Sequence, residues 1–307
     1  MSEHSYKGQD SEKILLTGAT GYVGGRLLSR LINDGREVRC LVRRPGSLSQ
    51  DIHKRAEVVK GDLLDANSLK GVFKDISTAY YLVHSMGMGG DFEKKDRVAA
   101  ENFVASAEKA GVKRIVYLGG LGRGEDLSTH LASRQEVGRV LRDSKIPVIE
   151  FRAAVIVGSG SLSFEMIKAL VNKLPVMTTP KWVSTMTQPI YIGDVIEYLV
   201  ASLSVDIQES VVVEIGGADR VSYLGMMEEY AMQTDKKRLM IKVPVLTPRL
   251  SSWWLWLVTP LQADVGRELI EGVRNETVVA DDTAERLFDI RPLGINEAIK
   301  AALSENI

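Results

Sequence analysis

Residues 14–24 read ILLTGATGYVG, a short apolar run followed by three glycines at three-residue spacing. The run predicts a strand, and the residues after the glycine turn begin an amphipathic helix. Gly18 permits a sharp turn, Gly21 lets backbone approach a pyrophosphate, and Gly24 lets the helix pack against the sheet. The stretch therefore predicts a dinucleotide at the positive end of the helix, the alternative being an ordinary glycine turn. The expected cofactor-binding residues here are Gly18, Thr20, Gly21, Tyr22, Val23 and Gly24.

Charge and cysteine content narrow the classes of partner. The 307 residues include 39 basic and 40 acidic side chains, a net charge of −1, so we do not expect nucleic acid to bind. Cys40 is the single cysteine, which excludes a disulfide framework and a cysteine-rich metal site. We expect a cytoplasmic protein without a metal.

Two segments bear on targeting. Residues 1–12 are polar and lack the apolar centre of a signal peptide, so we expect a disordered tail. The apolar stretch Trp253–Val258 is far shorter than the roughly 20 residues of a spanning helix. We therefore expect no transmembrane segment, although peripheral membrane contact through this stretch remains open.

Strand-like and helix-like segments alternate from Lys13 onward, which is typical of a parallel sheet covered by helices. About six strands predict an α/β fold of the Rossmann type, a doubly wound parallel sheet. Glu136 stands three residues after Ser133, which predicts that Ser133 caps a helix ending at Arg142. The further strands expected after the first are 38–42, 58–59, 79–83, 114–118 and 146–157, and the expected helices include 66–73 and 97–110.

The alternation loosens after Gly158. Residues 162–174 and 222–234 have the pattern of helices outside the first core, and the tail from Leu287 to Leu303 looks like a short helix after Pro292. Residues 189–192 and 211–215 look like strands that return to the sheet, with a helix between them. We expect a core of residues 13–160 joined by 188–218, and a smaller interleaved substrate lobe of residues 161–187 and 219–307.

Two arginines end the second predicted strand. An enzyme that uses NAD places an acid about twenty residues after the glycine turn, where it meets the adenosine ribose. This chain has Arg43 and Arg44 there and no carboxylate. A guanidinium matches phosphate oxygens, so the sequence favours NADP(H) over NAD(H). The alternative is a solvated basic loop.

Further candidates follow the next strands. Asp62 and Leu63 come after the third strand, where an adenine ring would lie, although Asp62 equally suits a local cap. Val83 and His84 end the fourth strand, at the sheet edge where ligands bind. Val155 lies near the end of the sixth strand.

These motifs together resemble the short-chain dehydrogenase/reductase superfamily. The chain looks most like its atypical branch, the NmrA-like and NAD(P)H-binding proteins related to the complex I 39 kDa accessory subunit. Two pieces, YLVHSM from residue 81 and EGVRNE from residue 271, look like a bacterial subgroup of uncharacterised oxidoreductases. The remaining motifs that carry the resemblance are Gly61–Leu63, Arg152–Gly158 and Asp194-Val195 after Gln188–Ile190.

The resemblance also implies a proton-transfer site, and here the chain departs from the family. Family members that catalyse typically use a Tyr-x-x-x-Lys pair with a serine. This chain has His130 and Arg134 at the pair, and Gly119 and Gly120 where the serine is expected. Either His130 exchanges the proton beside Arg134, which also suits the ribose hydroxyls, or the site has lost this chemistry.

Three functions remain open. The first is an NADPH-dependent reductase of an apolar carbonyl or quinone-like acceptor. The second is a non-catalytic NADP(H) sensor that regulates a protein partner. The third is a membrane- or complex-associated assembly protein that uses the Trp253–Val258 stretch. An oligomer is compatible with each of them.

Overall fold

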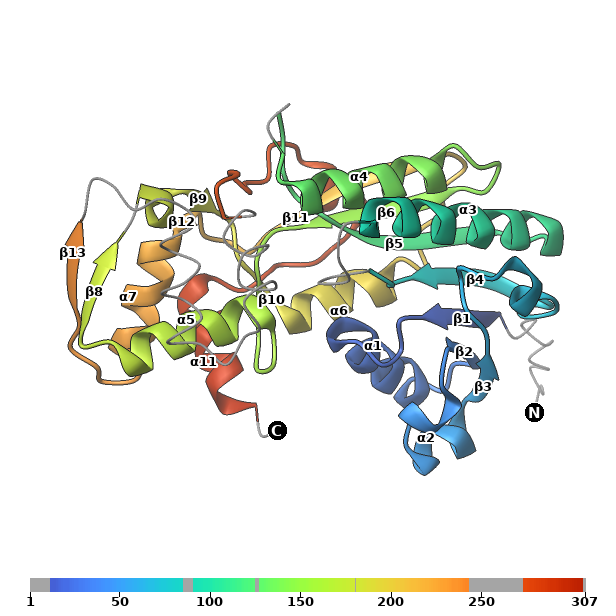
Figure 1. Cartoon of the computed structure of the whole chain (residues 1–307), viewed down its shortest axis with the longest axis horizontal. Helices are drawn as coiled ribbons and strands as arrows, with labels where there is room; N and C mark the ends of the chain where they lie inside the picture. The colour runs from blue at the N-terminus through green and yellow to red at the C-terminus, as the bar shows by residue number, and fades with distance from the viewer. Residues whose placement is uncertain (1–11, 85–90, 125–126, 180, 243–272, 306–307) are drawn as a thin grey trace, which may run out of the picture.

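The computed structural model describes residues 12–84, 91–124, 127–179, 181–242 and 273–305. Its centre is a parallel sheet of seven strands in the order β11-β6-β5-β4-β1-β2-β3 (Figure 1). The order reverses between β1 and β4, as in a doubly wound Rossmann sheet. The strands are β1 (Lys13–Thr17), β2 (Val38–Val42), β3 (Glu57–Lys60), β4 (Ile76–Tyr81), β5 (Arg114–Gly120), β6 (Val148–Ala153) and β11 (Val211–Ile215).

The central strands are buried along nearly their whole length because helices cover both faces of the sheet. Helices α1 (Tyr22–Asn33) and α6 (Ile192–Ala201) pack on one face, and α3 (Phe92–Ala110) and α4 (Thr129–Arg142) on the other (Figure 1). Leu27, Leu31 and Leu199 belong to the core on the first face, and Phe103 and Leu141 to the core on the second. The expected α/β Rossmann fold is confirmed.

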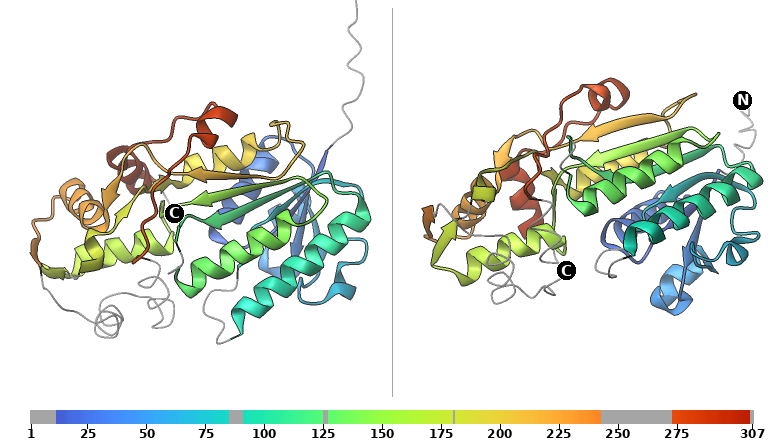
Figure 2. Two further views of the ribbon diagram at one scale, coloured as in Figure 1. Left: turned by 90° about the horizontal axis from the view of Figure 1, so that it is seen from above. Right: turned by 45° about the horizontal axis from the view of Figure 1, so that its top comes forward.

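A smaller group of elements extends from the carboxyl side of the sheet (Figure 2). It has its own apolar core, which contains Phe164, Met227 and Ile299. The boundaries proposed between core and lobe stay a prediction. The elements here are β7 (Ile156–Val157), α5 (Leu162–Lys173), β8 (Val176–Thr179), η3 (Lys181–Ser184), β9 (Met186–Thr187), β10 (Ile190–Tyr191), β12 (Val221–Ser222), α7 (Tyr223–Gln233), β13 (Leu239–Lys242) and α11 (Ile295–Ser304).

The remaining described elements are short. They connect the larger elements around the sheet, and η1 begins with a proline at its first turn, where a missing N–H costs nothing. They are η1 (Pro45–Ser47), α2 (Gln50–Arg55), η2 (Ala66–Leu69) and α10 (Thr283–Leu287).

The seven strands of the sheet are the six expected for the core and the returning strand 211–215. Three details correct the expectations. The expected strand 146–157 is broken, because β6 ends at Ala153 and β7 then leaves the sheet. Residues 211–215 join the sheet as its edge strand, whereas Ile190-Tyr191 pairs with β7 instead. The expected helix 66–73 is one 3-10 turn, η2, followed by turns.

The start of α4 was also predicted wrongly. Ser128 is the N-cap, and its Oγ accepts a hydrogen bond of 3.4 Å from the Leu131 amide. Ser133 lies inside the helix and is buried, where its hydroxyl donates to Asp96 Oδ2 at 3.3 Å. By contrast, α5 and α7 confirm the helices expected at 162–174 and 222–234 to within one residue.

Some expectations fall on residues outside the described ranges. They are residues 1–11 of the expected disordered tail and the apolar stretch Trp253–Val258. Across the ranges that are described, none of the helices combines the length and the apolar character needed to cross a membrane.

Candidate functional site

The candidate site lies where the strand order reverses, between the carboxyl ends of β1 and β4. The Thr17 side chain links the ends of β1 and β4. Its buried hydroxyl donates to the Tyr80 carbonyl at 2.9 Å and accepts from the Leu82 amide at 3.2 Å. The two strand ends are therefore held at a constant separation.

The glycine turn follows directly. Gly18 has a φ of +75°, and a Cβ there would overlap the Leu82 carbonyl. A Cβ at Gly24 would overlap the Gly18 carbonyl, so both positions require glycine. Gly21 is the N-cap of α1, where no side chain caps the helix and the first turn holds no acid. Its first amides are thus available to an anion.

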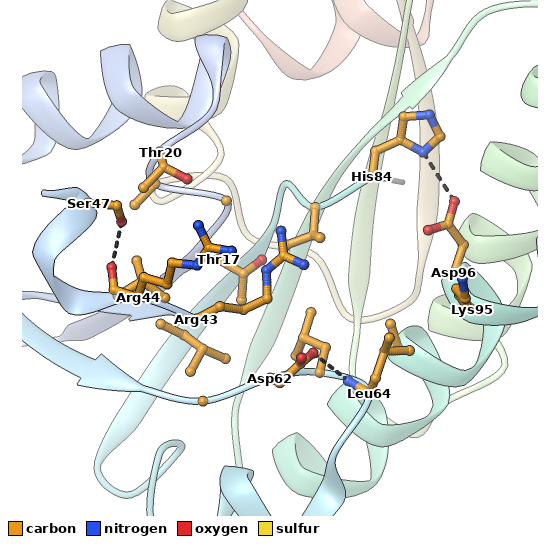
Figure 3. Close-up of a pocket in the computed structure, with 18 residues that line it drawn as sticks. Thr17, Thr20, Arg43, Arg44, Ser47, Asp62, Leu64, His84, Lys95 and Asp96 are labelled. Atoms are coloured by element: carbon orange, nitrogen blue, oxygen red, sulfur yellow. Dashed lines mark hydrogen bonds and ion pairs between the residues drawn. The ribbon is translucent and has the colours of Figure 1, made fainter. Parts of the chain in front are cut away.

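A cavity of about 420 Å³ opens beside this turn, within the size range of small-molecule sites. It is lined by the ends of the first four strands and by α3 (Figure 3). The lining residues are Thr17, Gly18, Ala19, Thr20, Leu41, Val42, Arg43, Arg44, Ser47, Gly61, Asp62, Leu63, Leu64, Val83, His84, Lys95, Asp96 and Ala99.

Arg43 and Arg44 reach into the cavity from the end of β2 (Figure 3). Both are exposed, and neither guanidinium has a hydrogen bond or an ion pair with any described residue. The Ser47 hydroxyl donates to the Arg44 carbonyl at 2.6 Å and shapes the turn that carries them. The cavity thus presents two planar cations that suit a phosphate group.

Asp62 and Leu63 form the wall that follows β3. Asp62 Oδ1 accepts from the Leu64 amide at 3.0 Å, so part of its carboxylate supports a local turn. The Ser68 hydroxyl accepts from the Asp62 amide at 2.8 Å and holds the same turn. Leu63 is buried, and its carbonyl accepts from Asn102 at 2.8 Å. This wall offers an apolar surface with one carboxylate, as an adenine ring would require.

His84 lines the cavity and contacts His130, which does not line it. His84 follows β4, and its Nε2 lies 2.9 Å from Nδ1 of His130 on α4. The rings meet edge to face, with centroids 4.3 Å apart. Nδ1 of His84 lies 3.2 Å from Oδ2 of the buried Asp96 on α3. Three elements distant in the sequence therefore place Asp96, His84 and His130 in one row.

Burial keeps both histidines neutral. It lowers the pKa of His130 to about 3, and His84 and Arg134 act in the same direction against the opposing effect of Asp96. Burial also lowers the pKa of His84, partly offset by its hydrogen bond to Asp96. Neither imidazole is therefore a standing proton donor at neutral pH.

Arg134 and Gly120 lie beside the pair. Arg134 Nη2 donates to the Leu118 carbonyl at 2.6 Å, while its buried Nε has no hydrogen-bond partner among the described residues. The Tyr117 hydroxyl in turn donates to the Arg134 carbonyl at 2.8 Å. A Cβ at Gly120 would lie 2.7 Å from the Leu131 side chain, so a serine there would require that side chain to shift.

The predicted catalytic residue His130 does not line the cavity. Six predicted cofactor residues do not line it either, namely Gly21, Tyr22, Val23, Gly24, Arg134 and Val155. The Tyr22 hydroxyl is buried, and a Cβ at Gly158 would overlap it. Val23 packs on the core of the first sheet face. Val155 packs on the lobe core, and its carbonyl accepts from the Ile190 amide at 2.9 Å.

Asp96 is the functional residue that the sequence prediction missed. It lies three, seven and eleven residues before Ala99, Phe103 and Ala107, the buried stripe of α3. A carboxylate on an apolar stripe is unusual, since buried acids need a partner. The position of Asp96 on this apolar stripe was the feature of the sequence that could have identified it.

Comparison with known proteins agrees with this geometry. Residues 18–150 match the family model described as NAD(P)H-binding. Residues 18–150 form an NAD(P)H-binding domain. Its Rossmann-type sheet agrees with this match, and membership of the atypical short-chain dehydrogenase/reductase group stays a prediction. Its relation to the complex I subunit stays a prediction.

Individual relatives cover the chain to different extents. The 3β-hydroxysteroid dehydrogenase/Δ5→4-isomerase of Mycobacterium tuberculosis is 29% identical over 115 residues, which span 34% of this chain and 30% of that protein. The triphenylmethane reductase of a Citrobacter species, solved with NADP(H), has a TM-score of 0.75 at 18% identity, covering 94% of this chain and 99% of that one. A nucleoside-diphosphate-sugar epimerase from Staphylococcus aureus has a TM-score of 0.74 at 17% identity, covering 94% and 99%. The structural likenesses show the shared fold.

Proposed function

We propose that the protein is an NADP(H)-dependent oxidoreductase that acts on an apolar carbonyl or quinone-like group. The supporting observation is one cavity lined by the unpaired Arg43 and Arg44 and by His84 (Figure 3), whose ring contacts His130 on α4. The cofactor supplies hydride chemistry when it is bound.

Each part of the cavity has a role in this proposal. The amides at the start of α1 receive the pyrophosphate, and Arg43 with Arg44 binds the 2′-phosphate of NADP(H). Leu63 and Asp62 receive the adenine. His130 exchanges the substrate proton with the support of His84, since the family's tyrosine is absent. The M. tuberculosis relative is named for a hydroxysteroid, which adds apolar ring alcohols to the substrates worth testing.

The test is a spectrophotometric assay of NADPH oxidation and NADP⁺ reduction. The acceptors are menadione, phenanthrenequinone and 1-decalone, and the donors are 1-decalol and dehydroepiandrosterone. We expect turnover with at least one compound, with His130→Gln slowed about 10²-fold or more because it lacks a group for proton exchange. Tight binding of NADPH without turnover of any of these compounds would contradict the proposal and favour the sensor function.

A matched pair of variants separates cofactor binding from catalysis. Arg43→Ala should raise the KM for NADPH, because it removes a cation from the cavity. Lys54→Ala removes an exposed cation of α2 that does not line the cavity, and it should leave this KM unchanged. An equal rise in both variants would mean that general surface charge, rather than the cavity, attracts the cofactor.

A further inference from the structure

Asp96, His84 and His130 are linked by two consecutive hydrogen bonds. Oδ2 of Asp96 lies 3.2 Å from Nδ1 of His84, and Nε2 of His84 lies 2.9 Å from Nδ1 of His130. The Ser133 hydroxyl donates to the same carboxylate oxygen at 3.3 Å, which fixes its orientation. The acid is buried and each histidine is mostly enclosed, so this geometry is held by packing.

The Asp96 carboxylate determines which ring nitrogens of His84 and His130 carry a proton. A neutral imidazole has one N–H and one bare nitrogen. Because Asp96 accepts at Nδ1 of His84, the N–H of neutral His84 is at Nδ1 and its Nε2 is bare. Bare Nε2 can only accept, so His130 donates from Nδ1. Nε2 of His130 is then the bare atom at the end of the row, and it is a proton acceptor.

Charged neighbours keep His84 and His130 in these neutral protonation states. Arg134 on α4 opposes a positive charge on either histidine, and burial acts in the same direction. Lys95 on α3 is a cation that lines the cavity, and Asp96 is the one acid that favours protonation of both rings among the described residues. A proton is therefore held best on His84, next to that carboxylate.

We propose that Asp96, His84 and His130 form a proton relay whose resting state takes a proton from a substrate hydroxyl, so that the preferred substrate is an apolar secondary alcohol. This inference rests on the proposed function. Bound NADP⁺ would supply the acceptor for the hydride of the substrate C–H bond, and the substrate O–H bond gives its proton to Nε2 of His130 as the C=O bond forms. The Nδ1 proton of His130 passes to Nε2 of His84, and the positive charge rests beside Asp96.

The relay accounts for the low proton affinity of His130. A lone imidazole of such low basicity is a poor general base near pH 7. In the relay His130 gains one proton and loses another, so it stays neutral throughout. His130 is the catalytic residue, and His84 and Asp96 are positioning residues that receive the charge. Reduction of the ketone runs through the same steps backwards and needs a proton already on His84.

The first test determines which histidine ring nitrogens carry a proton in the absence of substrate. In protein labelled with ¹⁵N in its histidine rings, NMR at pH 7.5 distinguishes bare from protonated nitrogens. We expect protonated Nδ1 and bare Nε2 in both His84 and His130. Asp96→Asn places an amide donor against His84, so both tautomers should invert. Protonated Nε2 on His130 in the native protein would overturn the relay whether or not the protein is an oxidoreductase.

The second test measures oxidation of 1-decalol by NADP⁺ between pH 5 and 9. Asp96→Asn should lower kcat at least about 10²-fold and abolish its fall toward low pH, with the KM for NADP⁺ unchanged. Glu93→Gln, an exposed acid on the same helix, should behave as the native protein. A native kcat and pH profile in Asp96→Asn would overturn the relay.

Two further readouts keep these outcomes separate. Ser133→Ala removes only the hydroxyl that orients the carboxylate, so it should give a smaller loss of kcat in a protein that still folds. Absence of turnover in the native protein, together with the expected tautomers, would contradict the proposed function and leave the relay geometry standing.

Discussion

At the residue scale, the lack of a side chain at Gly24 allows α1 to pack close to the sheet. A Cβ there would overlap the Gly18 carbonyl, which is backbone and cannot move aside. Gly24→Ala should therefore displace α1, lower stability by about 1–3 kcal/mol or more, and weaken NADPH binding. Thermal unfolding and NADPH titration by calorimetry would measure both effects.

The adjacent Gly25 is the control. A Cβ there would lie 3.4 Å from the Ala19 carbonyl, an ordinary contact, and alanine favours a helix over glycine by up to about 1 kcal/mol. Gly25→Ala should leave stability unchanged or raise it. Similar losses in the two variants would show that the close approach at Gly24 is not what holds α1 in place.

His130 makes stability depend on pH. Its pKa falls to about 3 in the folded chain, chiefly through burial, from an ordinary value of 6.5. The unfolded chain therefore binds an extra proton between these values, so stability is full above pH 6.5 and decreases as the pH falls below it. His130→Gln should remove a slope of up to about 1.4 kcal/mol per pH unit in this window, measured by urea unfolding at several pH values.

His53 provides the comparison for that measurement. It is exposed on α2, and its ring contacts the Pro45 carbonyl at 3.1 Å. His53→Gln should leave the pH dependence close to that of the native protein. If His130→Gln kept the native slope, the burial of His130 would not be the source of the acid sensitivity.

The sequence predicted the residues of the cofactor-binding end of the site better than the arrangement of the proton-transfer end. The glycines and Arg43 with Arg44 follow from local spacing, because the turn and the strand end are contiguous in the chain. The row of Asp96, His84 and His130 joins three distant elements, so only packing reveals it. The position of Asp96 on the buried stripe of α3 was the one local sign.

At the element scale, a buried acid anchors α4 to the sheet. Glu150 on β6 is fully buried, pairs with Arg142 of α4, and accepts from Arg152 Nε at 2.7 Å. Glu150→Ala leaves two guanidinium groups without this partner, so we expect a loss of about 3–5 kcal/mol in the free energy of unfolding. Because α4 carries His130, turnover should fall as well.

A partly exposed acid on α4 serves as the reference. Glu136 pairs with Arg139 on the outer face of the helix at 2.7 Å. Glu136→Ala should cost less than about 1 kcal/mol, since exposed ion pairs contribute little. Chemical unfolding of the two variants compares the costs directly, and equal costs would contradict the anchoring role of Glu150.

Helix boundaries show where local patterns mislead. The spacing of Ser133 and Glu136 has the form of a capping box, but Ser133 faces Asp96 inside the fold and Ser128 caps the helix instead. Residues 153–157 are all apolar and give no local sign of a strand end, yet the chain leaves the sheet after Ala153. Tertiary partners decide both features, and one sequence does not display them.

At the scale of the whole molecule, the end of the chain ties the lobe to the sheet. Glu305 accepts from Arg26 of α1 at 2.7 Å, from the Ser159 amide at 3.2 Å and from the Tyr191 hydroxyl at 3.0 Å. Glu305→Ala should lower stability by about 1 kcal/mol, because the cluster is partly exposed, and should loosen the loop after β7. Amide hydrogen exchange of residues 156–161 would detect that opening.

Glu93 again offers a comparison, since it is an exposed acid far along the chain on α3. Glu93→Ala should leave exchange at residues 156–161 unchanged. Faster exchange in neither variant would mean that other contacts hold the lobe against the sheet.

The order of the sheet was the most predictable large feature. Alternating strands and helices with short connections lead to one doubly wound arrangement, which the structure shows. The small parallel pair of β7 and β10 was not predictable, because two-residue strands carry no periodicity.

The central claim is that this cavity holds NADP(H), and the dissociation constants of NADPH and NADH test it most directly. We predict that the native protein binds NADPH at least about 10-fold more tightly than NADH, since each arginine–phosphate hydrogen bond contributes about 1.5–3 kcal/mol. In the double variant Arg43→Ala/Arg44→Ala the preference should disappear while NADH binding is kept. Equal native affinities, or an equal loss for both nucleotides in the variant, would contradict the claim.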